Sequence, residues 1–104
     1  MLPSRLIVFL RGAALAALLL AAGCQTAPPV QEMSDARQAI TVAKEAGAAE
    51  HAGDDLKAAV EFLKSAEEAL GTQRYARARR DALQAKSKAL EALRRSEIEQ
   101  AENP

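Results

Sequence analysis

Apolar residues follow two different patterns along the chain. An unbroken run of apolar or small residues extends from Gly12 to Ala22. From Met33 onward the apolar residues, most of them alanine, recur at steps of three and four, and proline is absent until Pro104. That spacing places apolar side chains on one face of a helix. The sequence therefore predicts an all-α domain that follows a short apolar segment of a different kind.

We expect three helices in the domain, covering about residues 34–48, 54–70 and 73–101. Asp35 and Gln38 have the spacing of a capping box at the start of the first helix. Asp54 and Asp55 favour the start of the second, because negative charge is stabilising near a helix N-terminus. Glycines indicate the intervening turns: Gly47, Gly53 and Gly71. The expected architecture is a short antiparallel three-helix bundle with a long C-terminal helix.

Each expected helix has an apolar stripe. The first stripe consists of Ala36, Ala39, Ile40, Ala43 and Ala46. The second consists of Leu56, Ala59, Val60, Leu63, Ala66 and Leu70. The third consists of Tyr75, Ala78, Ala82, Ala85, Ala89 and Ala92, and its alternating steps make a heptad seam. Small side chains at a contact line let helix axes approach closely, which favours antiparallel neighbours. Alanine is also the best helix former, so helix propensity alone is the competing interpretation of this seam.

The third helix is expected to be longer than its neighbours, so its last turns should lack a partner within one copy of the chain. This overhang would either be a docking or self-association surface or fray in solvent. The surface would consist of Ala92, Leu93, Ile98 and Ala101.

The first two dozen residues have the order of an export signal. Arg5 and Arg11 precede the apolar run, and small residues follow it. A transmembrane helix is the alternative, but the 11 residues from Gly12 to Ala22 would reach only about 16 Å, against a hydrocarbon core of about 30 Å. We therefore assign residues 1–23 to a signal peptide.

The segment from Leu20 to Cys24 resembles the lipobox of bacterial lipoproteins, with Ala21 at a position where leucine is commoner. The resemblance implies cleavage after Gly23 and covalent attachment of diacylglycerol and an N-acyl chain to Cys24. A free thiol left by ordinary signal cleavage is the alternative. In such lipoproteins, Gln25 in place of aspartate implies transport to the outer membrane, with the domain facing the periplasm.

Residues 24–32 are expected to be the lipidated N-terminus and a tether, residues 33–101 the helical domain and residues 102–104 a tail. Pro28 and Pro29 make the tether extended and semi-rigid, with a reach of about 25 Å. It would hold the domain away from the bilayer.

Charge is balanced overall, at 14 basic and 14 acidic residues, and only three residues are aromatic, which argues against binding of nucleic acid. The distribution is uneven, because residues 32–68 are mainly acidic and residues 74–95 mainly basic. The basic positions include Arg74, Arg77, Arg79, Arg80, Lys86 and Lys88. They would pair with acidic neighbours or, alternatively, bind an anionic envelope polymer or lipid.

Catalytic chemistry has little support in the sequence. His51 is the only histidine and Cys24 the only cysteine, so neither has an evident metal-binding or catalytic partner. Ser65, Ser87 and Ser96 lie on helical stretches without the pattern of an activated nucleophile. We expect no enzyme activity, no small-molecule substrate, no metal and no cofactor other than the lipid.

Several segments resemble the bacterial family called domain of unknown function 4398. These are Ala36 to Ile40, Ala46 to Ala52, Leu56, and Tyr75 to Ala78, so the resemblance covers about residues 34–93. It implies a short alanine-rich helical domain, often found on lipoproteins. The family commonly has tyrosine and proline at the positions of His51 and Gly53, and glycine at that of Gln73. The expected function is that of a membrane-anchored, non-enzymatic structural or protein-interaction module of the envelope.

Overall fold

The computed structural model describes residues 4–13 and 27–103, and every regular element within them is helical. A short helix covers residues 4–13. The domain consists of α2 (Val30–Glu45), α3 (Ala48–His51), α4 (Gly53–Gly71) and α5 (Tyr75–Glu102). The predicted all-α class and long C-terminal helix are confirmed.

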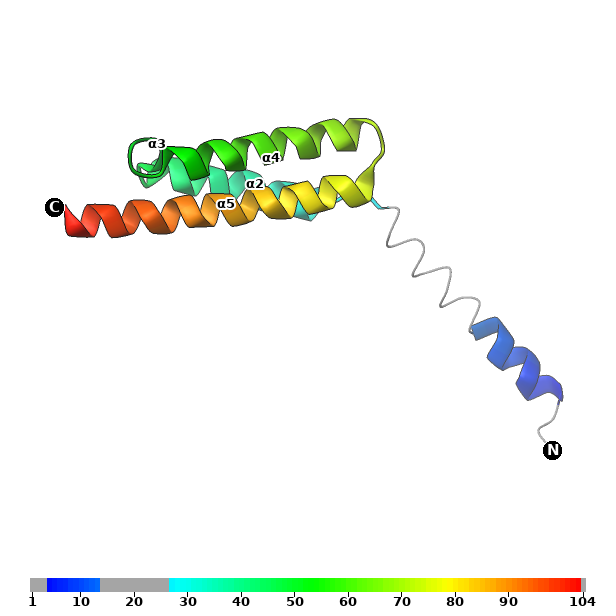
Figure 1. Ribbon diagram of the computed structural model, residues 1–104. Helices are drawn as coiled ribbons and strands as arrows, with labels where there is room; N and C mark the ends of the chain where they lie inside the picture. Colours follow the sequence, from blue (N-terminus) through cyan, green and yellow to red (C-terminus); the bar gives the residue numbers. More distant parts are fainter. Residues whose placement is uncertain (1–3, 14–26, 104) are drawn as a thin grey trace.

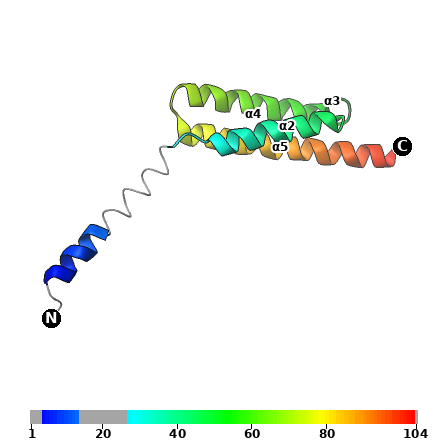
Figure 2. The same cartoon turned by 180° about the vertical axis from the view of Figure 1, so that it is seen from behind.

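Helix α5 runs the length of the domain, and α2 and α4 both pack along it (Figure 1). The view from behind shows the same arrangement, with α4 antiparallel to both other long helices (Figure 2). The start of α2 and the turn between α4 and α5 therefore lie at one end of the domain, which we call the tether end. The short helix α3 and the last turns of α5 lie at the other, which we call the far end.

Alanine makes up most of the core. The predicted seam of α5 is confirmed, because five of its alanines are fully buried: Ala78, Ala82, Ala85, Ala89 and Ala92. Tyr75 is only half-buried, and the seam instead continues to the fully buried Ser96. The Ser96 hydroxyl donates a hydrogen bond of 2.8 Å to the carbonyl oxygen of Ala92, which satisfies this polar group inside the core.

The buried stripe of α4 is narrower than predicted. Leu56, Ala59 and Ala66 are buried, and Leu63 and Leu70 pack partly against the core. Val60 was expected to be buried, but its side chain is 42% exposed. Helix α4 packs mainly against α5 and much less against α2, so the edge of its stripe is left uncovered.

Helix α2 begins at Val30, four residues before the predicted start at residue 34. The capping box of Asp35 and Gln38 does not form, since Pro29 is the N-cap and makes no side-chain capping bond. Proline suits this place, because its missing N–H would have no partner in the first turn of a helix. The expected extended tether over residues 24–32 is thus wrong for residues 30–32, which are helical.

The far end also differs from the prediction. Helix α2 ends at Glu45, and Gly47 turns the chain with a left-handed φ of 87°. The chain then forms α3, which packs on α5 where an unpartnered overhang was expected. Ala48 of α3 and Ala92 of α5 are both fully buried in one apolar cluster, which Leu93 contacts.

Polar contacts hold the same region. The Gln100 side chain donates a hydrogen bond of 2.6 Å to the carbonyl oxygen of Ala46, and His51 Nδ1 lies 3.4 Å from Glu99 Oε1. The last turns of α5 therefore have partners within the chain, and the predicted overhang is wrong. Of the surface assigned to it, only Ile98 and Ala101 are exposed.

Candidate functional site

The predicted lipidation residue Cys24 and cleavage residue Gly23 lie outside the described residues. The nearest described residue of the domain is Ala27, three positions after Cys24. On the other side, residues 4–13 form the helix that carries Arg5 and Arg11. Within the described segments, no helix combines the length and apolar character that crossing a membrane requires.

Arg79 fixes the place where the chain enters the bundle. Its Nη2 atom donates a hydrogen bond of 3.2 Å to the carbonyl oxygen of Ala27, and its Nε atom lies 3.4 Å from Glu32 Oε1. Pro29 and Met33 are buried beside this contact. One arginine of α5 thus holds both the entering segment and the first turn of α2, so the described part of the domain begins three residues after Cys24.

The turn between α4 and α5 is a Schellman motif. The Gln73 N–H donates to the Leu70 carbonyl oxygen at 3.1 Å, and the Arg74 N–H donates to that of Ala69 at 2.8 Å. Gln73 has a φ of 60°, in the left-handed region that glycine usually occupies at this position of the motif. The predicted stop at Gly71 agrees with the last residue of α4, but the conformation of Gln73 makes the turn. Arg74 is thereby placed at the tether end.

Four of the six predicted basic residues have acidic partners. Arg79 pairs with Glu32 and Lys86 with Asp35, and both of these contacts join α5 to α2. The other two pairs, Arg77 with Asp81 and Lys88 with Glu91, lie within α5. The expectation that these basic residues pair with acidic residues of a packed neighbouring helix is confirmed for Arg79 and Lys86 alone.

Arg74 and Arg80 are exposed and form no ion pair with any residue in the described ranges. Arg77 is also open to solvent, with 54% of its side chain exposed, and its distance of 3.7 Å to Asp81 is long. Arg77 and Arg80 are three positions apart in the first two turns of α5, and Arg74 is the N-cap residue of the same helix. We call Arg74, Arg77 and Arg80 the basic ridge.

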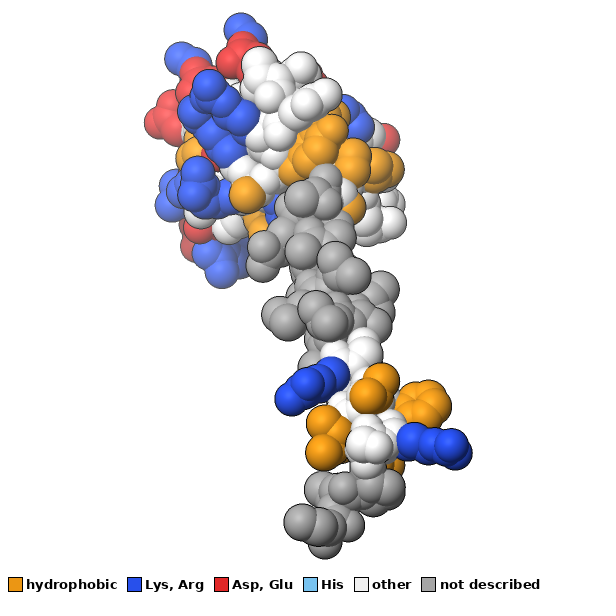
Figure 3. Space-filling model, turned by 90° about the vertical axis from the view of Figure 1, so that its right-hand side faces the viewer, with side chains coloured by type: hydrophobic (Ala, Val, Ile, Leu, Met, Phe, Trp, Pro, Cys, Tyr) orange, Lys and Arg blue, Asp and Glu red, His pale blue; other side chains and the backbone are white. Residues whose placement is uncertain are grey.

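The basic ridge borders a shallow cavity of about 230 Å³ at the tether end, lined by Ser65, Glu68, Ala69, Thr72, Arg74 and Arg77. The hydroxyl of Ser65 donates a hydrogen bond of 2.7 Å to Asp81 Oδ2, which joins α4 to α5 behind it. Figure 3 looks onto this end and shows Lys and Arg side chains gathered on one side of the bundle. The arrangement offers guanidinium groups to an anion at the surface rather than an enclosed site for a substrate.

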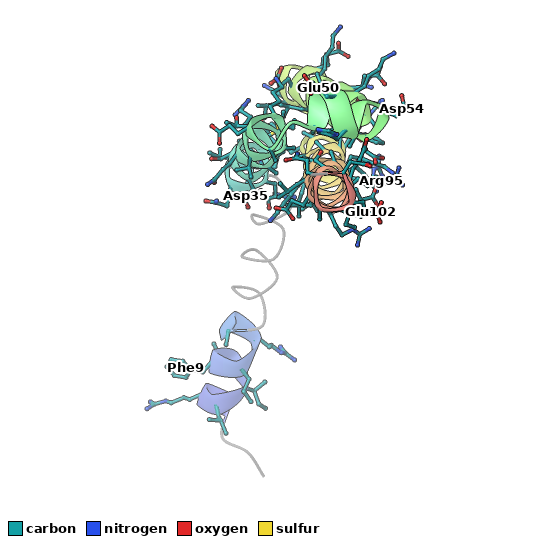
Figure 4. All side chains as sticks on the ribbon, turned by 90° about the vertical axis from the view of Figure 1, so that its left-hand side faces the viewer. Phe9, Asp35, Glu50, Asp54, Arg95 and Glu102 are labelled. Atoms are coloured by element: carbon teal, nitrogen blue, oxygen red, sulfur yellow. The ribbon has the colours of Figure 1, made fainter. Side chains whose placement is uncertain are left out.

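Other titratable groups lie at the far end. His51 faces Glu99, and Arg95 Nε lies 3.1 Å from Asp55 Oδ2, a contact without hydrogen-bond geometry. Figure 4 looks onto this end and shows Arg95 on the same side of the bundle as Asp54. In the parts of the chain that the structure describes, no group of three His, Cys, Asp or Glu residues is arranged to hold a metal ion.

A family model described as "Domain of unknown function (DUF4398)" matches residues 31–103. The match covers most of the chain and all four helices from α2 to α5, except the first residue of α2. The chain belongs to the DUF4398 family. The resemblance expected over residues 34–93 is therefore confirmed and extends to the end of α5. No match to this DUF4398 chain was found among curated proteins or among solved structures.

Proposed function

We propose that this DUF4398 protein is a lipoprotein of the bacterial outer membrane that faces the periplasm and acts as a non-enzymatic structural or interaction module. The observation that carries the proposal is the order of its segments. A basic and apolar leader ends in a lipobox-like sequence at Cys24, and the ordered domain begins at Ala27. A chain that becomes folded so soon after a lipidated residue is suited to work at the membrane surface.

The chemistry of the anchor supports a permanent attachment. The Cys24 thiolate would displace the phosphate headgroup from the glycerol carbon of a phospholipid, which forms a thioether to diacylglycerol and releases the headgroup phosphate. Hydrolysis of the Gly23–Cys24 peptide bond would then free the α-amino group, which would take an acyl chain from the ester of a second phospholipid and leave a lysophospholipid. Burial of acyl chains contributes about 0.8 kcal/mol per methylene, so a doubly or triply acylated residue stays in the bilayer. The domain would thereby be confined to the surface of one membrane.

The structure of the domain favours an interaction module over a site for chemistry. Its core is filled by small side chains, and its cavities are shallow, such as the one beside the basic ridge. The surface predicted on the last turns of α5 is reduced to Ile98 and Ala101, because Ala92 and Leu93 pack into the core. Self-association or binding of an envelope protein would have to use other exposed residues as well.

A second candidate function is binding of an anionic envelope polymer or lipid through the basic face of α5. The exposure of Arg74 and Arg80, without ion pairs to described residues, favours it. Arg79 and Lys86 pair with acidic residues of α2, so they are not free to bind an anionic ligand. This function would therefore be concentrated at the tether end.

Replacement of the anchoring residue tests the proposed function. Cells expressing wild-type protein, Cys24→Ala or the neighbouring control Thr26→Ala are grown with radiolabelled palmitate and separated into membrane and soluble fractions. We expect label and outer-membrane location for the wild type and the control, and an unlabelled, unprocessed chain for Cys24→Ala. Equal labelling and fractionation of all three proteins would rule out the anchor.

Crosslinking in the same cells then distinguishes the two candidate functions. A crosslinked protein supports the structural or interaction module, whereas a crosslinked glycan or lipid supports binding of an anionic envelope polymer or lipid.

A further inference from the structure

We propose that the tether end of the bundle rests on the bilayer surface, with the basic ridge of Arg74, Arg77 and Arg80 in contact with the phosphate groups of anionic lipids. The inference rests on the proposed lipid anchor at Cys24. It adds the orientation of the domain, the surface that faces the membrane and the chemistry of its partner.

The first argument is the length of chain between the anchor and the domain. Because Arg79 holds the carbonyl oxygen of Ala27, only three residue steps separate this fixed point from Cys24. Three extended residues span about 10 Å. The tether was predicted to reach about 25 Å, but only about 10 Å of chain lies between Cys24 and the fixed point. The bundle must therefore stay close to the lipid headgroups.

The second argument is the position of the ridge relative to this fixed point. Arg79 lies between Arg77 and Arg80 in the first two turns of α5, so the residue that holds the entering chain belongs to the same turns as the ridge. The ridge spans about 9 Å along the helix axis, at 1.5 Å per residue from Arg74 to Arg80. Along the axis of α5, the ridge therefore lies at the same level as the point where the chain enters the bundle from the proposed anchor.

The third argument is the charge difference between the two ends. From Ala69 to Arg80 there are four arginines and no acidic residue, although Glu68 lines the neighbouring cavity and Glu32 faces Arg79. At the far end, residues 94–102 contain three glutamates and two arginines, and residues 48–55 contain three acidic residues and no lysine or arginine. Figure 4 shows Glu50, Asp54, Arg95 and Glu102 around that end. An anionic surface would attract the basic tether end and repel the acidic far end. Both effects favour an upright bundle, in which the tether end touches the bilayer and the far end points away from it.

The experiment measures the distance of each end from the headgroups in the lipidated protein. Acylated full-length product is purified from cell membranes, and mass spectrometry first establishes the modification of Cys24. A fluorophore is attached to a thiol introduced by Ala76→Cys at the tether end or by Ala101→Cys at the far end, both of which are exposed positions. Energy transfer to a headgroup acceptor is then measured in vesicles of phosphatidylcholine with or without phosphatidylglycerol.

We expect strong transfer from position 76 and weak transfer from position 101 in the anionic vesicles, because about 38 Å of helix separates the two. R74E/R80E should lower the preference for the upright orientation by more than about 25-fold, because loss of the two arginines alone accounts for roughly fivefold each and the two new carboxylates are repelled as well. K57E/R94E reverses two exposed charges nearer the far end and should preserve or strengthen the upright orientation, because it makes the repelled end more acidic. Salt at 1 M should act like R74E/R80E, since it shortens the Debye length to about 3 Å.

Three results would overturn the inference. The first is equal energy transfer from positions 76 and 101 in anionic vesicles. The second is an R74E/R80E protein whose energy transfer equals that of the wild type. The third is that binding of purified anionic envelope polymer depends on the basic ridge, whereas the orientation on vesicles does not depend on it. Circular dichroism of each variant excludes unfolding as the cause. An unacylated Cys24 would overturn the anchor together with this inference, whereas an acylated protein without the orientation would overturn the inference alone.

Discussion

Gln100 and Ala46 are 54 positions apart in the sequence, and the Gln100 side chain donates a hydrogen bond of 2.6 Å to the Ala46 carbonyl oxygen. This bond satisfies a carbonyl group at the C-terminal cap of α2, where no further helical turn supplies a donor. It also ties the last turns of α5 to the turn that leads into α3. This hydrogen bond holds α2 and α5 together at the far end, and the heptad pattern of apolar residues did not predict it.

Gly47→Ala should destabilise the domain by about 1–2 kcal/mol, because an L-residue is strained at its φ of 87°. A Cβ atom there would also lie 3.3 Å from Gln100 Nε2 and from His51 Cδ2, so both contacts of the far end would be disturbed. Gly71→Ala is the matched control, since a Cβ atom there meets nothing within 4 Å. It should be neutral or stabilising by up to about 1 kcal/mol. Urea denaturation measures both, and equal effects would show that the left-handed turn is unimportant.

Gln73→Gly should stabilise the domain by about 0.5–1 kcal/mol. The substitution removes the strain of a φ of 60° from the Schellman motif, at some cost from the added freedom of the unfolded chain. Gln84→Gly, in an exposed and regular part of α5, should instead cost about 1 kcal/mol. A loss of stability on Gln73→Gly would contradict the assigned turn.

Arg79→Ala should release the entering chain while costing about 1 kcal/mol or less in global stability, because the pair with Glu32 is partly exposed. The sensitive measurement is amide hydrogen exchange at Met33, whose N–H donates to the Pro29 carbonyl oxygen at 3.0 Å. Its exchange should become faster in Arg79→Ala. Arg94→Ala removes an exposed arginine and should leave this amide unchanged. Unchanged exchange in both variants would mean that Arg79 does not hold the junction.

Ala82→Leu should destabilise the domain by about 1–3 kcal/mol, because Ala82 is fully buried against Met33 and Ala66 and leaves no room for a larger side chain. Ala76→Leu makes the same change at an exposed position of the same helix and should stay within about 0.5 kcal/mol of wild type. Thermal unfolding compares the two. If Ala82→Leu proved as stable as Ala76→Leu, alanine would be present for helix propensity alone.

The periodicity of the sequence predicted the buried faces of the helices, because these recur at fixed steps. It did not predict the turns, where the conformation of a single residue sets the direction of the backbone. The alanines of α5 recur at fixed steps, so the buried seam from Ala78 to Ala92 could be predicted. The left-handed conformation of Gln73 could not, because local preference favours glycine there and only the surrounding fold imposes it. Pro29 indicated an extended tether, yet tertiary burial makes it the N-cap of α2.

The candidate site was predicted as a set of residues but not as an arrangement. The sequence identified six basic residues of this part of the chain as candidates, without Arg94 and Arg95, but it does not show which acidic residue each will face. The structure divides them into those that pair with α2, such as Arg79 and Lys86, and the exposed ridge at the tether end. The topology supplies this distinction, because it brings the start of α5 beside the start of α2.

The mass of the N-terminal peptide from membrane-purified protein tests the central claim most directly. We expect a peptide that begins at Cys24 and carries diacylglycerol and an additional acyl chain, with no trace of residues 1–23. A free thiol on Cys24, or an N-terminus at any other residue, in protein recovered from the soluble fraction would contradict the lipid anchor and the membrane-facing function built on it.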